Sequence, residues 1–190
     1  MKKHLLVFAV VALAAGTSGY FLARSLSPSE APAGQEPVLT LNSETPDIDG
    51  LLGQRRPDFT LNDTQGNPVS ASDFDGTIWL ANFWATWCAP CVEEMPMLSQ
   101  LHKGHGEYGF KVVGIALDDP ERATQFAAEL EVTYTVLVGK TDVVLTGRRF
   151  GNATGMLPFS VLVDASGVIR WAHLGALSRE ELRRQIQLHR

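Results

Sequence analysis

The two cysteines of this 190-residue chain lie close together, as Cys88 and Cys91. An apolar, β-prone run over residues 77–84 leads into the pair, and a helical pattern with acidic residues follows it. A strand that ends at a helix N-terminus presents its thiols where the helix dipole favours a thiolate, the nucleophile of thiol chemistry. Two cysteines at this spacing can also close into a disulfide without rearranging the fold. The motif therefore predicts thiol–disulfide exchange.

Other uses of a Cys-x-x-Cys pair need residues that the chain lacks. A structural zinc site takes four ligands, and the nearest further candidates, His102 and His105, are expected to be solvated in a glycine-rich loop. Haem attachment takes a histidine directly after the second cysteine, where Val92 stands. A purely structural disulfide over so short a loop stabilises little. We therefore expect no metal and no other bound cofactor.

Composition limits the remaining possibilities. The length fits one domain of ordinary size with additional segments. Hydrophobic residues make up 45% of the chain, enough for a core that needs no disulfide bridges. The formal net charge of −5 argues against a general nucleic-acid binder, so no nucleic-acid partner is expected.

The N-terminal residues 1–23 are predicted to be a membrane anchor or a signal peptide. Two lysines precede an apolar run at 5–15, and apolar residues return at 20–23. Taken together, residues 5–23 are 19 residues long, close to the roughly 20 that cross a bilayer. This length favours an uncleaved anchor, and the preceding lysines favour a cytoplasmic N-terminus. A cleaved signal peptide with small residues at 12–14 is the alternative. The first interpretation places the protein in the inner (cytoplasmic) membrane, facing the periplasm or cell exterior, and the second makes it soluble and periplasmic.

Residues 24–56 are expected to form a flexible linker, because they are rich in Ser, Pro, Glu, Ala and Gly without sustained periodicity. The folded domain is expected at 57–190. It opens with a hairpin around the turn-rich residues 62–67, and strand and helix patterns then alternate. Strands are predicted at 77–84, 110–117, 134–138, 159–164 and 168–173, and helices from the cysteine motif to 103, at 120–130, at 141–150 and after 178.

This alternation predicts an α/β fold with a partly parallel sheet covered by helices on both faces and antiparallel strands added by the last hairpin. In the helix after the cysteines, apolar residues recur at every third position and mark the expected buried face. These residues are Val92, Met95, Leu98 and Leu101.

The residues around the cysteines resemble those of a known family. Residues 83–91 read FWATWCAPC, and Glu94-x-Pro96 follows. The motif is similar to the active site of the thioredoxin superfamily, and more narrowly to its TlpA/ResA-like branch of membrane-anchored, extracytoplasmic thiol–disulfide oxidoreductases. The similarity covers residues 57–190. It implies a thioredoxin-like fold, a central mixed sheet flanked by helices, with an N-terminal β-hairpin and an inserted helix and strand at 120–138.

The resemblance implies roles for the cysteine motif. Cys88 is expected to be the nucleophile, partly exposed at the helix N-terminus. Cys91 is expected to be less exposed and to resolve a mixed disulfide by attacking it. Pro90 takes an early helical position, where its missing N–H costs little, and lies between the sulfurs. Trp87 and Pro90 are expected to contact substrate, whereas Trp84 is expected in the core.

Glu94 is a further candidate catalytic residue. Thioredoxins carry a buried aspartate six residues before the first cysteine, where this chain has Asn82, which cannot act as a base. The TlpA/ResA-like branch instead has a glutamate three residues after the second cysteine, and Glu94 matches it. A carboxylate beneath the sulfurs can accept a proton from Cys91 and return it. The alternative is that Glu94, like Glu93, is an ordinary first-turn residue favoured by the helix dipole.

Pro158 matches the family's cis-proline, which faces the cysteine pair and offers backbone for pairing with an extended substrate. Leu157, the residue before it, differs from the threonine or valine common in relatives. We therefore treat Leu157 as a substrate-contacting residue and leave the substrate preference open.

The resemblance implies an enzyme that reduces disulfides of exported proteins, with cytochrome c maturation as one candidate process. Its expected partners are extracytoplasmic client proteins, a membrane thiol protein that donates electrons, and the lipid bilayer through the N-terminal segment. Three alternatives stay open. They are a dithiol oxidant, a thiol peroxidase, which shares the opening residues 57–59, and a non-enzymatic metal-binding or copper-delivery module, for which suitably placed His or Met ligands are lacking.

Overall fold

The computed structural model describes residues 48–104 and 109–189. The expected membrane segment at 1–23 and most of the expected linker lie outside these residues. Within the described part of the chain, no helix is both long and apolar enough to cross a bilayer.

A seven-stranded mixed sheet forms the centre of the domain, with strands in the order β2-β1-β5-β4-β3-β6-β7. The three central strands β5, β4 and β3 run parallel, and the other neighbours are antiparallel. The predicted mixed sheet, with an antiparallel hairpin at each edge, is confirmed. The strands are β1 (Thr60–Asp63), β2 (Pro68–Ser70), β3 (Ile78–Trp84), β4 (Phe110–Leu117), β5 (Thr135–Gly139), β6 (Phe159–Val163) and β7 (Ile169–Leu174).

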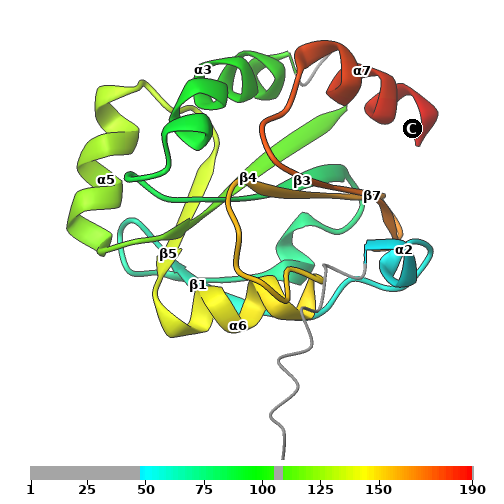
Figure 1. Ribbon diagram of the computed structural model, residues 1–190, viewed down its shortest axis with the longest axis horizontal. Helices are drawn as coiled ribbons and strands as arrows, with labels where there is room; N and C mark the ends of the chain where they lie inside the picture. The colour runs from blue at the N-terminus through cyan, green and yellow to red at the C-terminus, as the bar shows by residue number, and fades with distance from the viewer. Residues whose placement is uncertain (1–47, 105–108, 190) are drawn as a thin grey trace, which may run out of the picture. The chain divides into compact units, whose positions relative to one another are not determined.

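Helices cover both faces of this sheet (Figure 1). One face carries α3 (Ala89–Lys103), α5 (Pro120–Glu129) and α7 (Arg179–Leu188). The other carries α6 (Thr141–Arg149), the short helix α2 (Ile48–Leu51) and a 3-10 turn, η1 (Ala71–Phe74). The inserted helix and strand predicted at 120–138 correspond to α5 and β5.

Strand β3 joins the two halves of the core, and all seven of its residues are buried. Leu80 and Trp84 belong to the apolar cluster beneath α3, and Trp79 and Phe83 belong to the cluster on the α6 side. Side chains alternate between the faces of a strand, so a strand covered on both faces needs a nearly continuous apolar run. The polar Asn82 is the exception, and it faces α3.

The buried face of α3 differs in part from the prediction. Met95, Leu98 and Leu101 are buried, but Val92 is only half-buried, and the fully buried residue nearby is Cys91. A strict spacing of three drifts around a helix of 3.6 residues per turn, so the first member of the predicted series falls beside the buried face.

His102 lies in the last turn of α3, so the prediction of a solvated loop histidine is wrong. Its half-buried ring accepts, at Nδ1, a hydrogen bond from Val112 N–H at 3.1 Å. This bond connects the end of the helix to β4. His105 lies outside the described residues.

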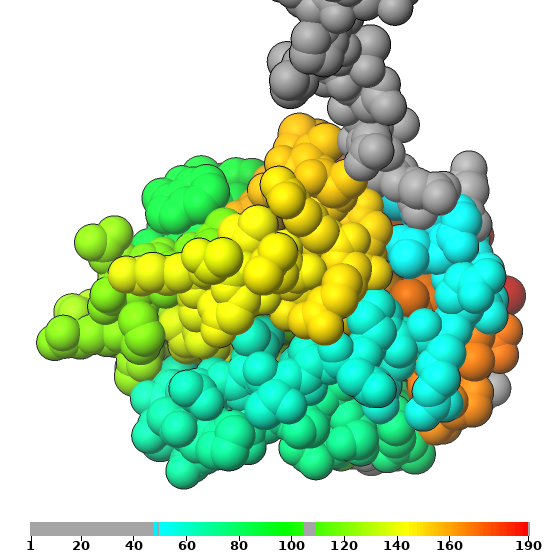
Figure 2. All heavy atoms as spheres, turned by 90° about the horizontal axis from the view of Figure 1, so that it is seen from below, coloured from blue at the N-terminus to red at the C-terminus, as the bar shows by residue number. Residues whose placement is uncertain are grey.

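The folded domain begins before Pro57, the boundary expected from the sequence. Backbone hydrogen bonds join Gly53 N–H to Ile169 O and Arg56 N–H to Gly167 O, both at 2.8 Å. In Figure 2, the cyan N-terminal part of the domain lies beside the orange residues around β7. The composition of a polar, proline-containing segment does not show that its backbone pairs with a distant strand, and the linker therefore ends earlier than expected.

The turn between β6 and β7 is organised by one carboxylate. Asp164 Oδ1 accepts hydrogen bonds from Ser166 N–H at 2.9 Å, Ser166 Oγ–H at 2.6 Å and Val168 N–H at 2.9 Å. Its Oδ2 accepts one from Arg170 Nε–H at 2.6 Å. Partial burial opposes ionisation, but these hydrogen bonds outweigh it and lower the pKa of Asp164 to about 2.

We predict that Asp164→Asn lowers the free energy of unfolding at pH 7 by about 2 kcal/mol. This is the free energy that corresponds to the fall of the Asp164 pKa from 3.8 to about 2 on folding. The folded-state pKa lies below the unfolded value of 3.8, so the stabilisation is complete above pH 4 and is lost as the pH falls toward 2. Denaturant unfolding at a series of pH values measures this. A difference between wild type and variant that is the same at pH 7 and pH 2.5 would contradict the prediction.

Candidate functional site

The two cysteines form a disulfide at the N-terminus of α3, with their Cα atoms 5.3 Å apart. Cys88 is the N-cap residue of the helix, and Pro90 stands in the first turn, where no helical hydrogen bond is lost. The sulfur of Cys88 therefore lies near the positive end of the helix dipole, which stabilises its thiolate once the disulfide is reduced.

The two cysteines differ in exposure. Cys88 is 6% exposed and Cys91 is 0% exposed. The order agrees with the prediction, but in the disulfide form Cys88 is buried, not partly exposed. It packs with Trp84 and Ala85 in the apolar cluster beneath α3. The small accessible area of the pair therefore belongs to Cys88.

The surface next to the disulfide is apolar. Trp87 is 66% exposed, and Pro90 is also exposed. Trp84 is fully buried, as expected for a core residue. An exposed aromatic ring directly before the first cysteine is available to contact another protein.

Leu157 and Pro158 precede β6, and the peptide bond between them is cis, the isomer that the family resemblance implies. Phe159 pairs with Phe83, which places Pro158 at the sheet edge where β3 enters the cysteine motif. Leu157 is half-buried against both apolar clusters. The Pro158 carbonyl accepts a hydrogen bond from Gly175 N–H at 2.9 Å, so it is already engaged within the domain.

Asp118 fixes the loop between β3 and Cys88, a role that the sequence reasoning missed. Its Oδ2 accepts hydrogen bonds from Thr86 N–H at 3.0 Å and Thr86 Oγ–H at 2.6 Å. Burial opposes ionisation of Asp118, but hydrogen bonds from Thr86 and from Asp119 N–H outweigh it and lower its pKa. A signal was present, because the carboxyl ends of neighbouring parallel strands meet at one edge of a sheet and Asp118 directly follows β4.

Glu94 is buried in the core one helical turn after Cys91 on α3, with 4% of its surface exposed. Asn82 Nδ2–H donates a hydrogen bond to Glu94 Oε1 at 2.8 Å, and Leu177 N–H donates one to Oε2 at 2.7 Å. Burial raises the pKa of Glu94, and the two hydrogen bonds offset part of that rise. Glu93, its neighbour in sequence, is exposed. The surroundings of Glu94 are therefore not those of an ordinary first-turn residue.

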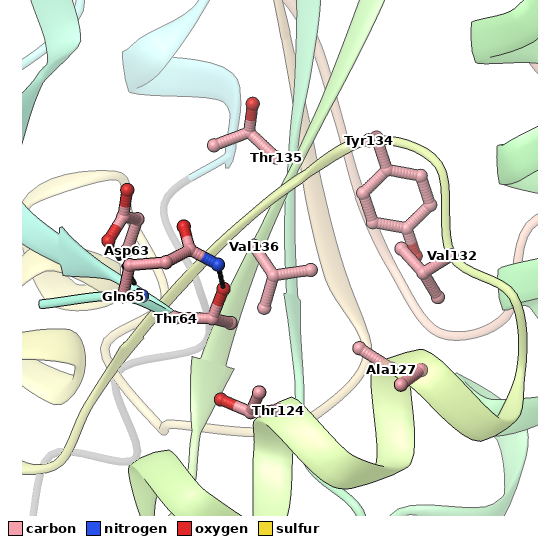
Figure 3. A pocket seen from close by; sticks show the side chains of 10 residues that line it. Asp63, Thr64, Gln65, Thr124, Ala127, Val132, Tyr134, Thr135 and Val136 are labelled. Atoms are coloured by element: carbon pink, nitrogen blue, oxygen red, sulfur yellow. Dashed lines mark hydrogen bonds between the residues drawn. The ribbon is translucent and has the colours of Figure 1, made fainter. Parts of the chain in front are cut away.

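A cleft of about 410 Å³ lies elsewhere, between the β1–β2 turn and α5 (Figure 3). Polar side chains such as Asp63, Gln65 and Thr124 line it, and Tyr134 forms part of its wall. Neither cysteine lines this cleft. Across the described residues, no group of three or more His, Cys, Asp or Glu side chains is placed to hold a metal ion.

Comparison with known proteins agrees with this geometry. The AhpC/TSA family profile matches residues 52–172. The chain is 31% identical over 142 residues to the thioredoxin-like protein YneN of Bacillus subtilis, covering 72% of this chain and 79% of that protein. It is 28% identical over 137 residues to the thiol-disulfide oxidoreductase ResA of Geobacillus kaustophilus, covering 72% and 76%.

Among solved structures, a thiol:disulfide interchange protein of the thioredoxin family from Chlorobium tepidum superposes with a TM-score of 0.64 at 26% identity, covering 72% of this chain and 96% of that one. The thioredoxin-like fold predicted from the motif is confirmed. Since the family profile spans most of the chain, including the residues that carry the cysteine pair, and the similarity to these oxidoreductases covers 72% of the chain, the chain belongs to the AhpC/TSA family and is a thioredoxin-like thiol–disulfide oxidoreductase of the ResA-like kind.

Proposed function

We propose that this oxidoreductase works outside the cytoplasm and reduces disulfides of exported proteins through Cys88 and Cys91. The observation that carries the proposal is the redox pair at the start of α3 with a buried carboxylate, Glu94, one helical turn after Cys91. A helix places residues three apart on the same face, so the carboxylate and the second thiol face the same region of the core.

The exchange has two steps. The Cys88 thiolate attacks one sulfur of the client disulfide, and the other client sulfur leaves as a thiolate, giving a mixed disulfide. The Cys91 thiolate then attacks Cys88 Sγ, and the second client thiolate leaves. Two electrons pass from the cysteine pair to the client, and the pair ends as the disulfide described above. In this proposal Glu94 accepts the proton that Cys91 loses before the second step.

The surface around Cys88 is proposed to bind the client. Trp87 and Pro90 offer exposed apolar area directly beside the disulfide. Pro158 has no N–H, and its carbonyl is engaged by Gly175 N–H. Backbone pairing with an extended client segment therefore falls to Leu157. Proteins that carry cysteines for cytochrome c maturation are one class of client that the proposal includes.

The direction of exchange is tested by the reduction potential of the cysteine pair and its state in cells. We predict a potential near the reducing end of the scale, about −270 mV, and a mostly dithiol state in thiol-trapping experiments. A potential of about −120 mV, which is at the oxidising end of the scale, together with a mostly disulfide state would instead support the dithiol-oxidant alternative. Turnover of hydrogen peroxide faster than that of protein disulfides would instead favour a thiol peroxidase.

The thiol roles lead to a second prediction. Cys88→Ser is expected to abolish reduction of a small-molecule disulfide, because the attacking thiolate is lost. Cys91→Ser is expected to keep the attack but to stall as a mixed disulfide, which mass spectrometry detects. If alkylation of the reduced protein shows Cys91 to be the faster-reacting thiol, the two roles are reversed.

The proton-acceptor role leads to a third prediction. Glu94→Gln is expected to slow release of the mixed disulfide by about tenfold to a hundredfold, because an amide cannot accept the proton. The wild-type rate is expected to fall as the pH drops through the raised pKa of Glu94, above the ordinary value of 4.5, and the variant lacks this inflection.

Glu93→Gln is the matched control, since it removes an exposed carboxylate from the same helical turn. Single-turnover kinetics of both variants between pH 4 and 8 measure the effect. Equal and negligible effects of the two substitutions would leave Glu94 without a role in the reaction.

Localisation is part of the proposal and rests on residues 1–23. We propose that this segment holds the catalytic domain at the inner membrane, facing the periplasm or cell exterior, where a membrane thiol protein supplies electrons. The full-length chain is expected to stay with the membrane after carbonate extraction. A mature protein that begins near residue 15 and is recovered in the soluble exported fraction would show that the segment is a cleaved signal peptide.

A further inference from the structure

Asn82 is a fully buried polar residue in the middle of β3, and it donates two hydrogen bonds. One goes from Nδ2 to Glu94 Oε1 at 2.8 Å, and the other goes from Nδ2 to Ser160 Oγ at 3.0 Å. We infer that Asn82 is the positioning residue of the exchange reaction: its amide, anchored on Ser160, holds the Glu94 carboxylate in one orientation one turn after Cys91. This inference rests on the proposed proton-acceptor role of Glu94.

The anchor belongs to the sheet and is independent of α3. Asn82 and Ser160 are directly opposite each other in the antiparallel pair β3–β6. Residues opposite one another in such a pair have their Cβ atoms about 5 Å apart, so the Ser160 hydroxyl stays within reach of the amide. The amide plane is thereby fixed by the strand register, and its second hydrogen atom is directed at the helix that carries the cysteines.

A second hydrogen-bond donor binds the other oxygen of the Glu94 carboxylate. Leu177 N–H, from the segment between β7 and α7, donates to Glu94 Oε2 at 2.7 Å. Each oxygen therefore has one donor, and the two donors come from different parts of the fold. Hydrogen bonds to a buried carboxylate are stronger than neutral ones. The carboxylate cannot turn away without losing one of them, while each oxygen keeps a lone pair that can accept a proton.

An amide suits this position better than the aspartate of thioredoxins. A carboxylate at position 82 would lie next to that of Glu94, and two like charges at such a distance cannot both ionise in a buried site. An amide instead donates to the ionised form and favours it. Among the described titratable groups, Tyr134 before β5 interacts with the charge of Glu94: its pKa is raised by burial and then by that charge. The other group that the proposal places beside Glu94 is Cys91, one helical turn earlier on α3, once it is reduced.

The experiment follows the resolution step, release of client thiol from the mixed disulfide, as a function of pH in otherwise intact protein. Asn82→Ala is expected to move the acid midpoint of the rate upward by about 0.5 to 1 pH unit, because a hydrogen bond to the charged form is lost. Ser160→Ala keeps the donor but removes its anchor, so it gives a smaller shift in the same direction. The attack step through Cys88 is expected to change by less than about twofold in both variants, because the hydrogen bonds of Asn82 and Ser160 lead to Glu94 and not to Cys88.

Ser99→Ala is the matched control, since it removes a buried hydroxyl on α3 that has no hydrogen-bond partner among the described residues. It is expected to leave the midpoint unchanged. In the Glu94→Gln background, Asn82→Ala is expected to have no further effect on the pH profile. Ser160→Ala keeps the test valid if Asn82→Ala does not fold, as judged by circular dichroism.

Different results would overturn the positioning role of Asn82 and the proton-acceptor role of Glu94. In one outcome, Glu94→Gln removes the acid inflection, but neither Asn82→Ala nor Ser160→Ala, made in protein that retains Glu94, moves the acid midpoint of the resolution rate. The positioning role is then overturned and the role of Glu94 stands. If Glu94→Gln leaves the inflection in place, the proton-acceptor role is overturned and the positioning role falls with it.

Discussion

The carboxylate of Glu94 lies in an apolar core, and the arrangement of the site depends on how that burial is tolerated. An isolated buried charge costs several kcal/mol unless hydrogen bonds compensate for it. Here the compensation comes from Asn82 on β3 and from the Leu177 backbone before α7. The register of β3 with β6 and the course of the chain into α7 are thus tied to one side chain on the helix that carries the cysteines.

The reactive end of the site is fixed by a different set of contacts, at the carboxyl edge of the parallel strands. β3 ends directly before the cysteine motif, and the carboxylate that follows β4 holds Thr86 through two hydrogen bonds. Cys88 then takes the N-cap position of α3, where the helix dipole acts on its sulfur, while Cys91 stays in the core. The two sulfurs therefore have different surroundings. Cys88 keeps a small exposed area beside the exposed Trp87, whereas Cys91 is fully enclosed and lies one helical turn before the buried Glu94.

Much of the fold was predictable, because β3 is a continuous apolar run and the cysteine motif marks where it meets a helix. The hairpins at both edges and the inserted α5–β5 unit were also predictable from turn residues and alternating patterns. The contacts that complete the site could not be predicted from the sequence. The bond from Leu177 N–H joins residues 83 positions apart, and no local pattern signals which backbone amide will face a carboxylate. The half-buried His102 was mispredicted because its burial depends on a hydrogen bond from Val112 N–H on the neighbouring strand to its ring. The early domain boundary was mispredicted because it depends on backbone hydrogen bonds to the distant Ile169 and Gly167.

The claim that Glu94 is a buried acid tuned to serve Cys91 is tested most directly by measuring its own ionisation. Carbon-13 NMR of the glutamate carboxyl groups in the reduced protein, assigned with Glu94→Gln, follows the titration of this residue alone. The account predicts a pKa above the ordinary value of 4.5, because burial outweighs the two hydrogen bonds. A pKa at or below 4.5 would contradict it, since such a group would be ionised throughout the working range and poorly matched to the thiol it is proposed to serve.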